Sequence, residues 1–172
     1  MIFKTFNMEK EPSGQGFVEG SYDLAIAVNV LHVSANMEAS LSNVRHLLKP
    51  GGFLVVAELT ATDLLFSGMT VGTLPGWWIG AETGRPWGPL LNLRQWDSAL
   101  KNSAFSGIDT LSPDISASLP MSVFVAQAVN DQITLLRNPL TIEERPANVR
   151  NQDLTILGGA TLPVYKLGQE VA

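Results

Sequence analysis

The chain has 172 residues, 45% of them hydrophobic, and a formal net charge of -5. Its length allows one domain, or one domain and part of another. Its apolar content allows a buried core, which excludes wholesale disorder. The acidic balance is the opposite of the basic face of nucleic-acid-binding proteins, so we expect no nucleic-acid partner. The lack of cysteine excludes a disulfide scaffold and a thiolate nucleophile, and with only two histidines we expect no metal site.

The sequence shows no targeting or membrane-spanning segment. Residues 1–16 lack the long apolar run behind a basic start that marks a secretory signal. The longest apolar stretches fall far short of the roughly 20 residues that cross a bilayer. We therefore expect a soluble, cytoplasmic protein that has no membrane partner.

The first third of the chain predicts a strand–helix–strand unit. Residues 2–8 alternate loosely between apolar and polar side chains, which favours a short strand. Residues 22–30 and 53–59 are continuous apolar runs, typical of strands buried on both faces of a parallel sheet. Between them, residues 36–48 have helical apolar spacing behind Asn36 as an N-cap, and the run KPGG stops the helix. We expect the two apolar strands to be adjacent and parallel.

The second half begins with a stretch of unusual composition. Residues 67–89 are rich in Gly, Trp and Pro and have little periodicity, so they predict a lid or a ligand-binding loop. Residues 93–103 predict a helix. Residues 105–111 and 122–129 predict two further strands.

Ligands bind beyond the carboxyl ends of the strands in an open α/β sheet, and two chemically useful side chains lie at such ends here. His32 follows the strand at 22–30, and Glu58 is near the end of the strand at 53–59. Neighbouring strands are about 4.8 Å apart, so the two side chains could meet, and the carboxylate would orient the imidazole as a general base. Alternatively, His32 caps the following helix and Glu58 faces water. The spacing alone leaves both interpretations open.

Two further features have an open interpretation. Trp77 and Trp78 lie in the Gly-rich stretch, where aromatic side chains often line a ligand groove, although they could equally pack in a core. We treat both as candidate substrate-binding residues and the other two tryptophans as structural. Gly158 and Gly159 follow a short apolar run and could open the phosphate loop of a dinucleotide-binding module, but two glycines are weak evidence.

Five segments of the sequence together resemble one family. They read YDLAIAVNVLH, NVRHLLKPGGFLVVAELT, GTLPGWWIGAETGRPWGP, QWDSALKNSAFSGIDT and SVFVAQAVND. In this order they resemble the C-methyltransferase domain of fungal highly reducing polyketide synthases, and the likeness covers residues 2–140. Many class I methyltransferases share KPGG, whereas LPGWW followed by GRPWGP and FSGID is highly specific. The tail DLTILGGATLPVYKL resembles the start of the Rossmann-like structural half of the ketoreductase in such synthases.

The resemblance implies an α/β fold, a class I (Rossmann-like) methyltransferase sheet that ends in an antiparallel hairpin made by 105–111 and 122–129. It places the C-terminal part of the methyltransferase domain at 1–137 and the start of the structural ketoreductase region at 153–172, and the polar, turn-prone residues 138–152 between them predict a linker. The family's glycine-rich cofactor loop and its first two strands have no counterpart in the chain. We therefore expect a truncated sheet.

The resemblance also implies an enzyme activity. S-adenosylmethionine would be the cofactor, and the methyl group would go to the α-carbon of a β-ketoacyl chain held on an acyl carrier protein by the remainder of the synthase. The family's His–Glu pair matches His32, which would remove the proton, and Glu58, which would orient His32. Asn7, where the family often has an acidic residue, and Asn29 are candidate cofactor contacts.

Two interpretations of the activity stay open. We expect the chain alone to bind the cofactor weakly and to be inactive, because it lacks the glycine-rich loop that approaches the methionine part of the cofactor. It would then work only as a segment of a larger synthase. The alternative is a non-catalytic remnant or structural module that carries the His–Glu pair without the cofactor-binding half.

Overall fold

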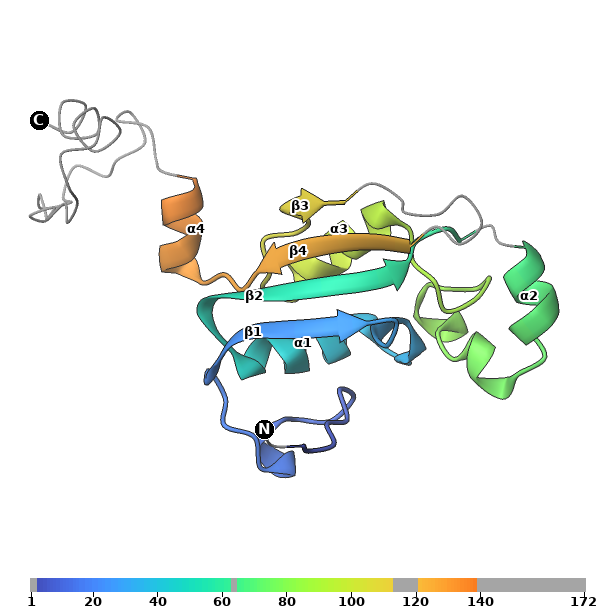
Figure 1. Cartoon of the computed structure of the whole chain (residues 1–172), viewed down its shortest axis with the longest axis horizontal. Helices are drawn as coiled ribbons and strands as arrows, with labels where there is room; N and C mark the ends of the chain where they lie inside the picture. Colours follow the sequence, from blue (N-terminus) through green and yellow to red (C-terminus); the bar gives the residue numbers. More distant parts are fainter. Residues whose placement is uncertain (1–2, 63–64, 113–120, 139–172) are drawn as a thin grey trace, which may run out of the picture. The chain divides into compact units, whose positions relative to one another are not determined.

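The computed structural model describes residues 3–62, 65–112 and 121–138, which form a four-stranded sheet in the order β1-β2-β4-β3 (Figure 1). The strands are Tyr22–Val28 (β1), Leu48–Leu59 (β2), Thr110–Leu111 (β3) and Met121–Gln127 (β4). β1 and β2 are parallel, whereas β4 is antiparallel to both β2 and β3. The structure confirms the adjacent parallel strands and the antiparallel pair that the sequence predicted.

In the described part of the chain, four α-helices accompany the sheet. They are Met37–Leu47 (α1), Leu65–Val71 (α2), Leu93–Asn102 (α3) and Asp131–Arg137 (α4). Short 3-10 helices lie at Ser13–Gln15, Leu31–Val33, Pro75–Trp78 and Ala81–Thr83. Figure 1 shows α1 and α3 on the same side of the sheet. None of the described helices is long and apolar enough to cross a membrane.

Helix α1 connects the two parallel strands and begins where the sequence predicts. The side-chain oxygen of Asn36 accepts a hydrogen bond from the Ala39 N–H at 3.0 Å, an N-cap that satisfies one of the free donors of the first turn. The helix ends at Leu47, and the KPGG run then forms the first part of β2. Gly51 takes a φ of 84° there, which glycine adopts without steric cost, and the pairing with β1 shifts register across this run.

One face of the sheet packs against α1 and α3. Leu54 and Val56 of β2 and Phe124 of β4 are fully buried and alternate with more exposed neighbours, as side chains on a half-covered strand do. Trp96 of α3 is fully buried as well, and its ring centroid lies 5.5 Å from that of Phe124. Burial of one such side chain contributes about 1.5–3 kcal/mol. This layer therefore holds the two central strands firmly in place.

The strand expected at residues 2–8 is absent over residues 3–8, the part of it that the structure describes. The Asn7 N–H donates to the side-chain oxygen of Gln15 at 2.8 Å, and the Gln15 amide donates to the Asn7 carbonyl at 2.8 Å. These bonds occupy backbone groups that a strand would offer to its neighbour. The prediction of a strand here is therefore wrong, although Phe6 still packs against the core.

The strand expected at residues 105–111 is shorter than predicted. Only Thr110–Leu111 is regular, and Phe105 forms an isolated bridge with Ala128. Between them Gly107 has a φ of 91°, which interrupts the regular strand. Backbone hydrogen bonds to β4 continue on the far side of this glycine, so the antiparallel pairing is kept in outline.

The Gly/Trp/Pro-rich stretch at residues 67–89 is more ordered than a loop. It holds most of α2 and the two 3-10 helices that begin at Pro75 and Ala81. Short 3-10 turns carry little apolar periodicity, which explains why the sequence pattern did not predict them. The predicted linker and the region after it lie outside the described residues, except for Asn138.

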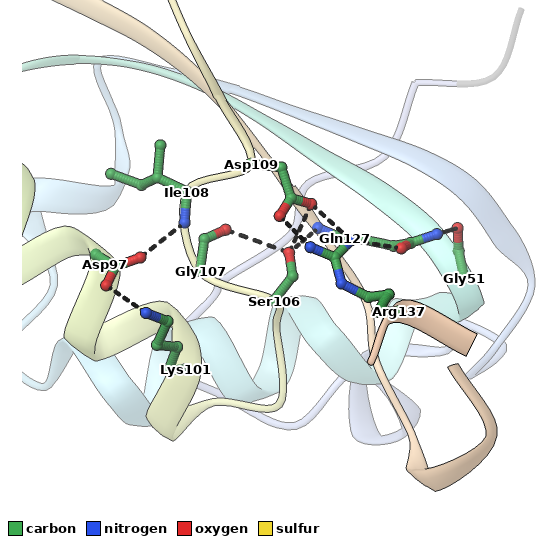
Figure 2. A network of polar contacts seen from close by, with 9 residues as sticks. All are labelled: Gly51, Asp97, Lys101, Ser106, Gly107, Ile108, Asp109, Gln127 and Arg137. Carbon is green, nitrogen blue, oxygen red and sulfur yellow. Dashed lines mark hydrogen bonds and ion pairs between the residues drawn. The ribbon is translucent and has the colours of Figure 1, made fainter. Parts of the chain in front are cut away.

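A network of polar contacts ties α3, α4 and β4 together at the end of β2 away from Glu58 (Figure 2). Arg137 of α4 forms an ion pair with Asp109, and its guanidinium also donates to the Gln127 side chain at 2.9 Å. On α3, Asp97 accepts from Lys101 at 2.7 Å and from the Ile108 N–H at 2.9 Å. These two hydrogen bonds lower the pKa of the Asp97 carboxyl.

Candidate active site

The carboxyl ends of β1 and β2 bring the two predicted residues to one edge of the sheet. Val28, the last residue of β1, pairs with Ala57 of β2, so the segments that follow both strands begin side by side. Asn29 then takes a φ of 49° and its N–H donates to the Ala57 carbonyl at 2.7 Å. Asparagine tolerates this left-handed turn better than most residues. The turn leads into the 3-10 helix that carries His32.

Glu58 is fully buried and its carboxylate has three hydrogen-bond partners. One oxygen accepts from the Val30 N–H at 2.9 Å and from the Leu31 N–H at 2.8 Å. The other oxygen lies 2.8 Å from Nδ1 of His32. A buried carboxylate is costly unless it is paired and hydrogen-bonded, and here two backbone donors and one imidazole fill that role.

This arrangement fixes the chemistry of the His32 ring. An ionised carboxylate only accepts hydrogen bonds, so when Glu58 is ionised Nδ1 of His32 carries the proton toward it, and in the neutral ring the lone pair then lies on Nε2. The His32 side chain keeps 15% of its exposure, against none for Glu58. A ring held in one tautomer by a buried carboxylate, with its other nitrogen free, is suited to accept a proton.

The structure therefore forms the contact that the strand ends suggested. Glu58 does not face water, and the N-cap of α1 is Asn36 and not His32, so the alternative interpretation is wrong on both points.

Arg85 contributes to the site although the sequence pattern did not single it out. Arg85 is 5% exposed. It donates to the carbonyls of His32 at 2.8 Å, Pro89 at 2.9 Å and Ala35 at 3.2 Å, and also to that of Ser34. Burial lowers the pKa of the guanidinium, which still stays charged because arginine is so basic. The sequence feature that could have indicated Arg85 is its place as the single charged residue of the otherwise uncharged stretch GRPWGP.

The two candidate tryptophans differ from each other in their surroundings. Trp77 lines a cavity of about 210 Å³ together with Trp87 and Arg85, and His32 is not among the lining residues. Trp78 does not line this cavity; its ring nitrogen donates to the Gly72 carbonyl at 2.9 Å. Of the two, Trp77 has the better position to touch a ligand.

The two candidate cofactor contacts also differ. Asn29 is exposed and lies at the carboxyl edge of the sheet, so its amide fits a polar contact to a ligand there. The side-chain oxygen of Asn7 already accepts from the Glu9 N–H at 2.9 Å, which leaves it less suited. Glu9 in turn accepts from the Ala35 N–H at 2.8 Å, so the Asn7 segment is tied to the His32 segment.

Comparisons with known proteins agree with the fold described above. A methyltransferase-domain family model matches residues 3–54. Trichosetin synthetase PKS-NRPS1 of Gibberella fujikuroi is 48% identical over 172 residues, which cover all of this chain and 4% of that protein. The solved trans-methyltransferase CalH, in complex with SAH, is 37% identical with a TM-score of 0.66, over 72% of this chain and 35% of CalH. The CMeT domain of the citrinin polyketide synthase is 27% identical with a TM-score of 0.65, over 76% of this chain and 33% of that one.

The sheet and the place of the site at its carboxyl edge define a class I methyltransferase fold. The relatives make this more specific. The chain is a fragment homologous to the S-adenosylmethionine-dependent carbon-methyltransferase domain of fungal polyketide synthases. It spans about 4–6% of the length of the curated relatives it matches, and about a third of CalH and of the citrinin CMeT domain.

Proposed function

We propose that this segment supplies the general base for methylation of the α-carbon of a β-ketoacyl chain, within a larger synthase that holds the chain on an acyl carrier protein. The observation that carries the proposal is the His32–Glu58 pair, with a fully buried carboxylate 2.8 Å from Nδ1 and a partly exposed ring. The homology to carbon-methyltransferase domains of polyketide synthases supports the substrate class.

Each residue of the pair has a distinct task. Nε2 of His32 takes the proton from the carbon between the two carbonyls, and the electron pair of the broken C–H bond is left delocalised over those carbonyls. Glu58 holds the ring in the tautomer that leaves Nε2 free, and its charge stabilises the imidazolium that forms. S-adenosylmethionine, when bound, supplies the methyl group for this carbon. Asn29 is the residue best suited to contact that cofactor, and Trp77 to contact the substrate.

The central test replaces the base. In the synthase that carries this segment, His32→Ala is expected to lower methylation by about 10²–10⁴-fold, the usual contribution of a general base. Binding of S-adenosylmethionine, followed by calorimetry, should stay nearly unchanged, because the imidazole contacts the substrate. Methylated and unmethylated products are separated by mass.

A matched control comes from the chain's other histidine. His46 is exposed on α1, and His46→Ala should leave methylation unchanged. Normal methylation by His32→Ala would overturn the role given to His32.

A further inference from the structure

The buried guanidinium of Arg85 joins two segments that are far apart in the sequence. Three of its acceptors are the carbonyls of His32, Ser34 and Ala35, which follow β1, and the fourth is the carbonyl of Pro89. One of the three is the backbone carbonyl of the candidate base itself, at 2.8 Å. The segment that contains Arg85 is thus bonded directly to the residue that would take the proton.

The surroundings of Arg85 are built for its side chain. Gly80 is buried, and a Cβ added there would lie 2.3 Å from Nε of Arg85, so the guanidinium packs against bare backbone. The Gly80 carbonyl also accepts from the Arg85 N–H at 3.0 Å. A second bond between the segments comes from the Thr83 hydroxyl, which donates to the Ala35 carbonyl at 2.7 Å.

A buried cation needs this many partners. Arginine has five N–H donors in a planar fork, and a charge without partners in the interior is strongly destabilising. The hydrogen bonds that stabilise Arg85 are the same bonds that hold residues 32–35. Loss of the guanidinium would therefore remove one donor from each of these four carbonyls, although that of Ala35 keeps its bond from Thr83, and would release the carbonyl of residue 32.

We propose that Arg85 is a positioning residue for His32: it fixes the backbone of residue 32 while Glu58 fixes the ring. This inference rests on the proposed function. The bond from Nδ1 to Glu58 alone does not fix the position of Nε2, because rotation of the backbone of residue 32 moves Nε2 even when Nδ1 stays bonded. The backbone of residue 32 must therefore be held as well. A displacement of about 1 Å in a catalytic group can cost about 10²-fold in rate.

The first variant removes the donors and keeps the length of the stem. In the synthase that carries this segment, Arg85→Met is expected to slow proton abstraction by about 10–10²-fold. The probe is a β-ketoacyl pantetheine thioester in D2O without S-adenosylmethionine, and deuterium uptake at the α-carbon is followed by mass. Rates are divided by the number of sites that bind S-adenosylmethionine in calorimetry, so loss of folded protein alone does not change them.

The second variant displaces the guanidinium and keeps its charge. Gly80→Ala places a methyl group where Arg85 lies and should slow deuterium uptake per site in the same way. Arg85→Lys, which retains a cation with fewer donors, should fall between Arg85→Met and the unchanged protein. The controls are Arg94→Met, at an exposed arginine of α3, and Gly76→Ala, where a Cβ meets nothing within 4 Å. Both should keep the original rate.

The results separate this inference from the proposed function. His32→Ala sets the background rate of deuterium uptake; if it exchanges as fast as the unchanged protein, the proposed function falls. If His32→Ala is at background while Arg85→Met and Gly80→Ala match their controls, only the positioning role is overturned. A rise in KM for the thioester at unchanged kcat would also overturn it, because Arg85 would then bind substrate. If Arg85→Met does not fold, Gly80→Ala and Arg85→Lys decide.

Discussion

Glu58 shows how one side chain can be fixed from two sides by partners of different kinds. The N–H groups of Val30 and Leu31 are donors that cannot turn away, so the oxygen that they bond must be an acceptor. The second oxygen is then left for His32. A carboxylate serves both sides because each of its oxygens accepts hydrogen bonds.

An amide at this position can accept hydrogen bonds on one side only. In Glu58→Gln, the amide oxygen must face Val30 and Leu31, so the NH2 group faces Nδ1 of His32. Nδ1 then has to accept, the ring proton moves to Nε2, and the ring can no longer take a proton there. We expect methylation by the synthase to fall by about 10²–10⁴-fold with little change in fold, because the shape is kept.

The measurement for Glu58→Gln is product mass beside the melting temperature of the protein. The tautomer itself can be read from the nitrogen chemical shifts of the His32 ring. A variant that still methylates at the original rate would show that Glu58 holds only the backbone of residues 30 and 31.

The site residues also differ in whether the sequence alone could predict their roles. His32 and Glu58 could be predicted because both follow apolar strands, and the ends of parallel strands meet at one edge. Arg85 could not, because all of its side-chain partners are backbone carbonyls, which every residue has and no sequence pattern marks. Its role is apparent only when the segments at 32–35 and 85–89 are seen together.

At the scale of elements, strands were predicted well where pairing is regular and badly where side chains compete for the backbone. β1 and β2 are long apolar runs with a helix between them, which leaves few other arrangements. The segment at residues 3–8 alternates between apolar and polar side chains, as a strand can, but the Gln15 side chain forms hydrogen bonds with the backbone N–H and carbonyl of Asn7. A competitor eight residues away along a loop leaves no periodic signal.

Gly107 interrupts the strand predicted at residues 105–111, which is the second difference from the prediction, and it gives a test of the connection between α3 and β4. Its φ of 91° disfavours any side chain, and a Cβ there would lie 2.4 Å from an Asp97 oxygen and 2.6 Å from Lys101 (Figure 2). Gly107→Ala should therefore strain the turn and push apart the Asp97–Lys101 pair. We expect a loss of about 1–3 kcal/mol in the free energy of unfolding.

Urea unfolding of the chain at low micromolar concentration, followed by tryptophan fluorescence, measures this loss. The control is Gly14→Ala, because a Cβ at Gly14 meets nothing within 4 Å and its φ is not positive. Equal midpoints for the two variants would mean that the turn is not strained by a side chain.

At the scale of the whole described chain, the sheet is covered unevenly. The face that packs on α1 and α3 is buried, whereas Leu24, Ile26 and Val28 of β1 are 50%, 67% and 60% exposed and Phe53 of β2 is 43% exposed. β1 is also the edge strand of the sheet, so one side of its backbone has no strand beside it. An apolar face next to an open edge favours association between copies of a chain.

The isolated chain should therefore associate and should not methylate. Sedimentation is expected to show associated species whose size increases with protein concentration. Ile26→Lys should reduce this association because it puts a charge in the centre of the exposed apolar patch. Methylation needs a bound methyl donor, and about two thirds of CalH, solved in complex with SAH, and of the citrinin CMeT domain has no counterpart in this chain. Without that part, the His32–Glu58 pair has its geometry but no methyl donor beside it. Incubation of the chain with S-adenosylmethionine and a β-ketoacyl thioester should leave the thioester mass unchanged, also with Ile26→Lys, which separates inactivity from association. Methylation by the chain alone would show that the residues described here are sufficient to hold the cofactor.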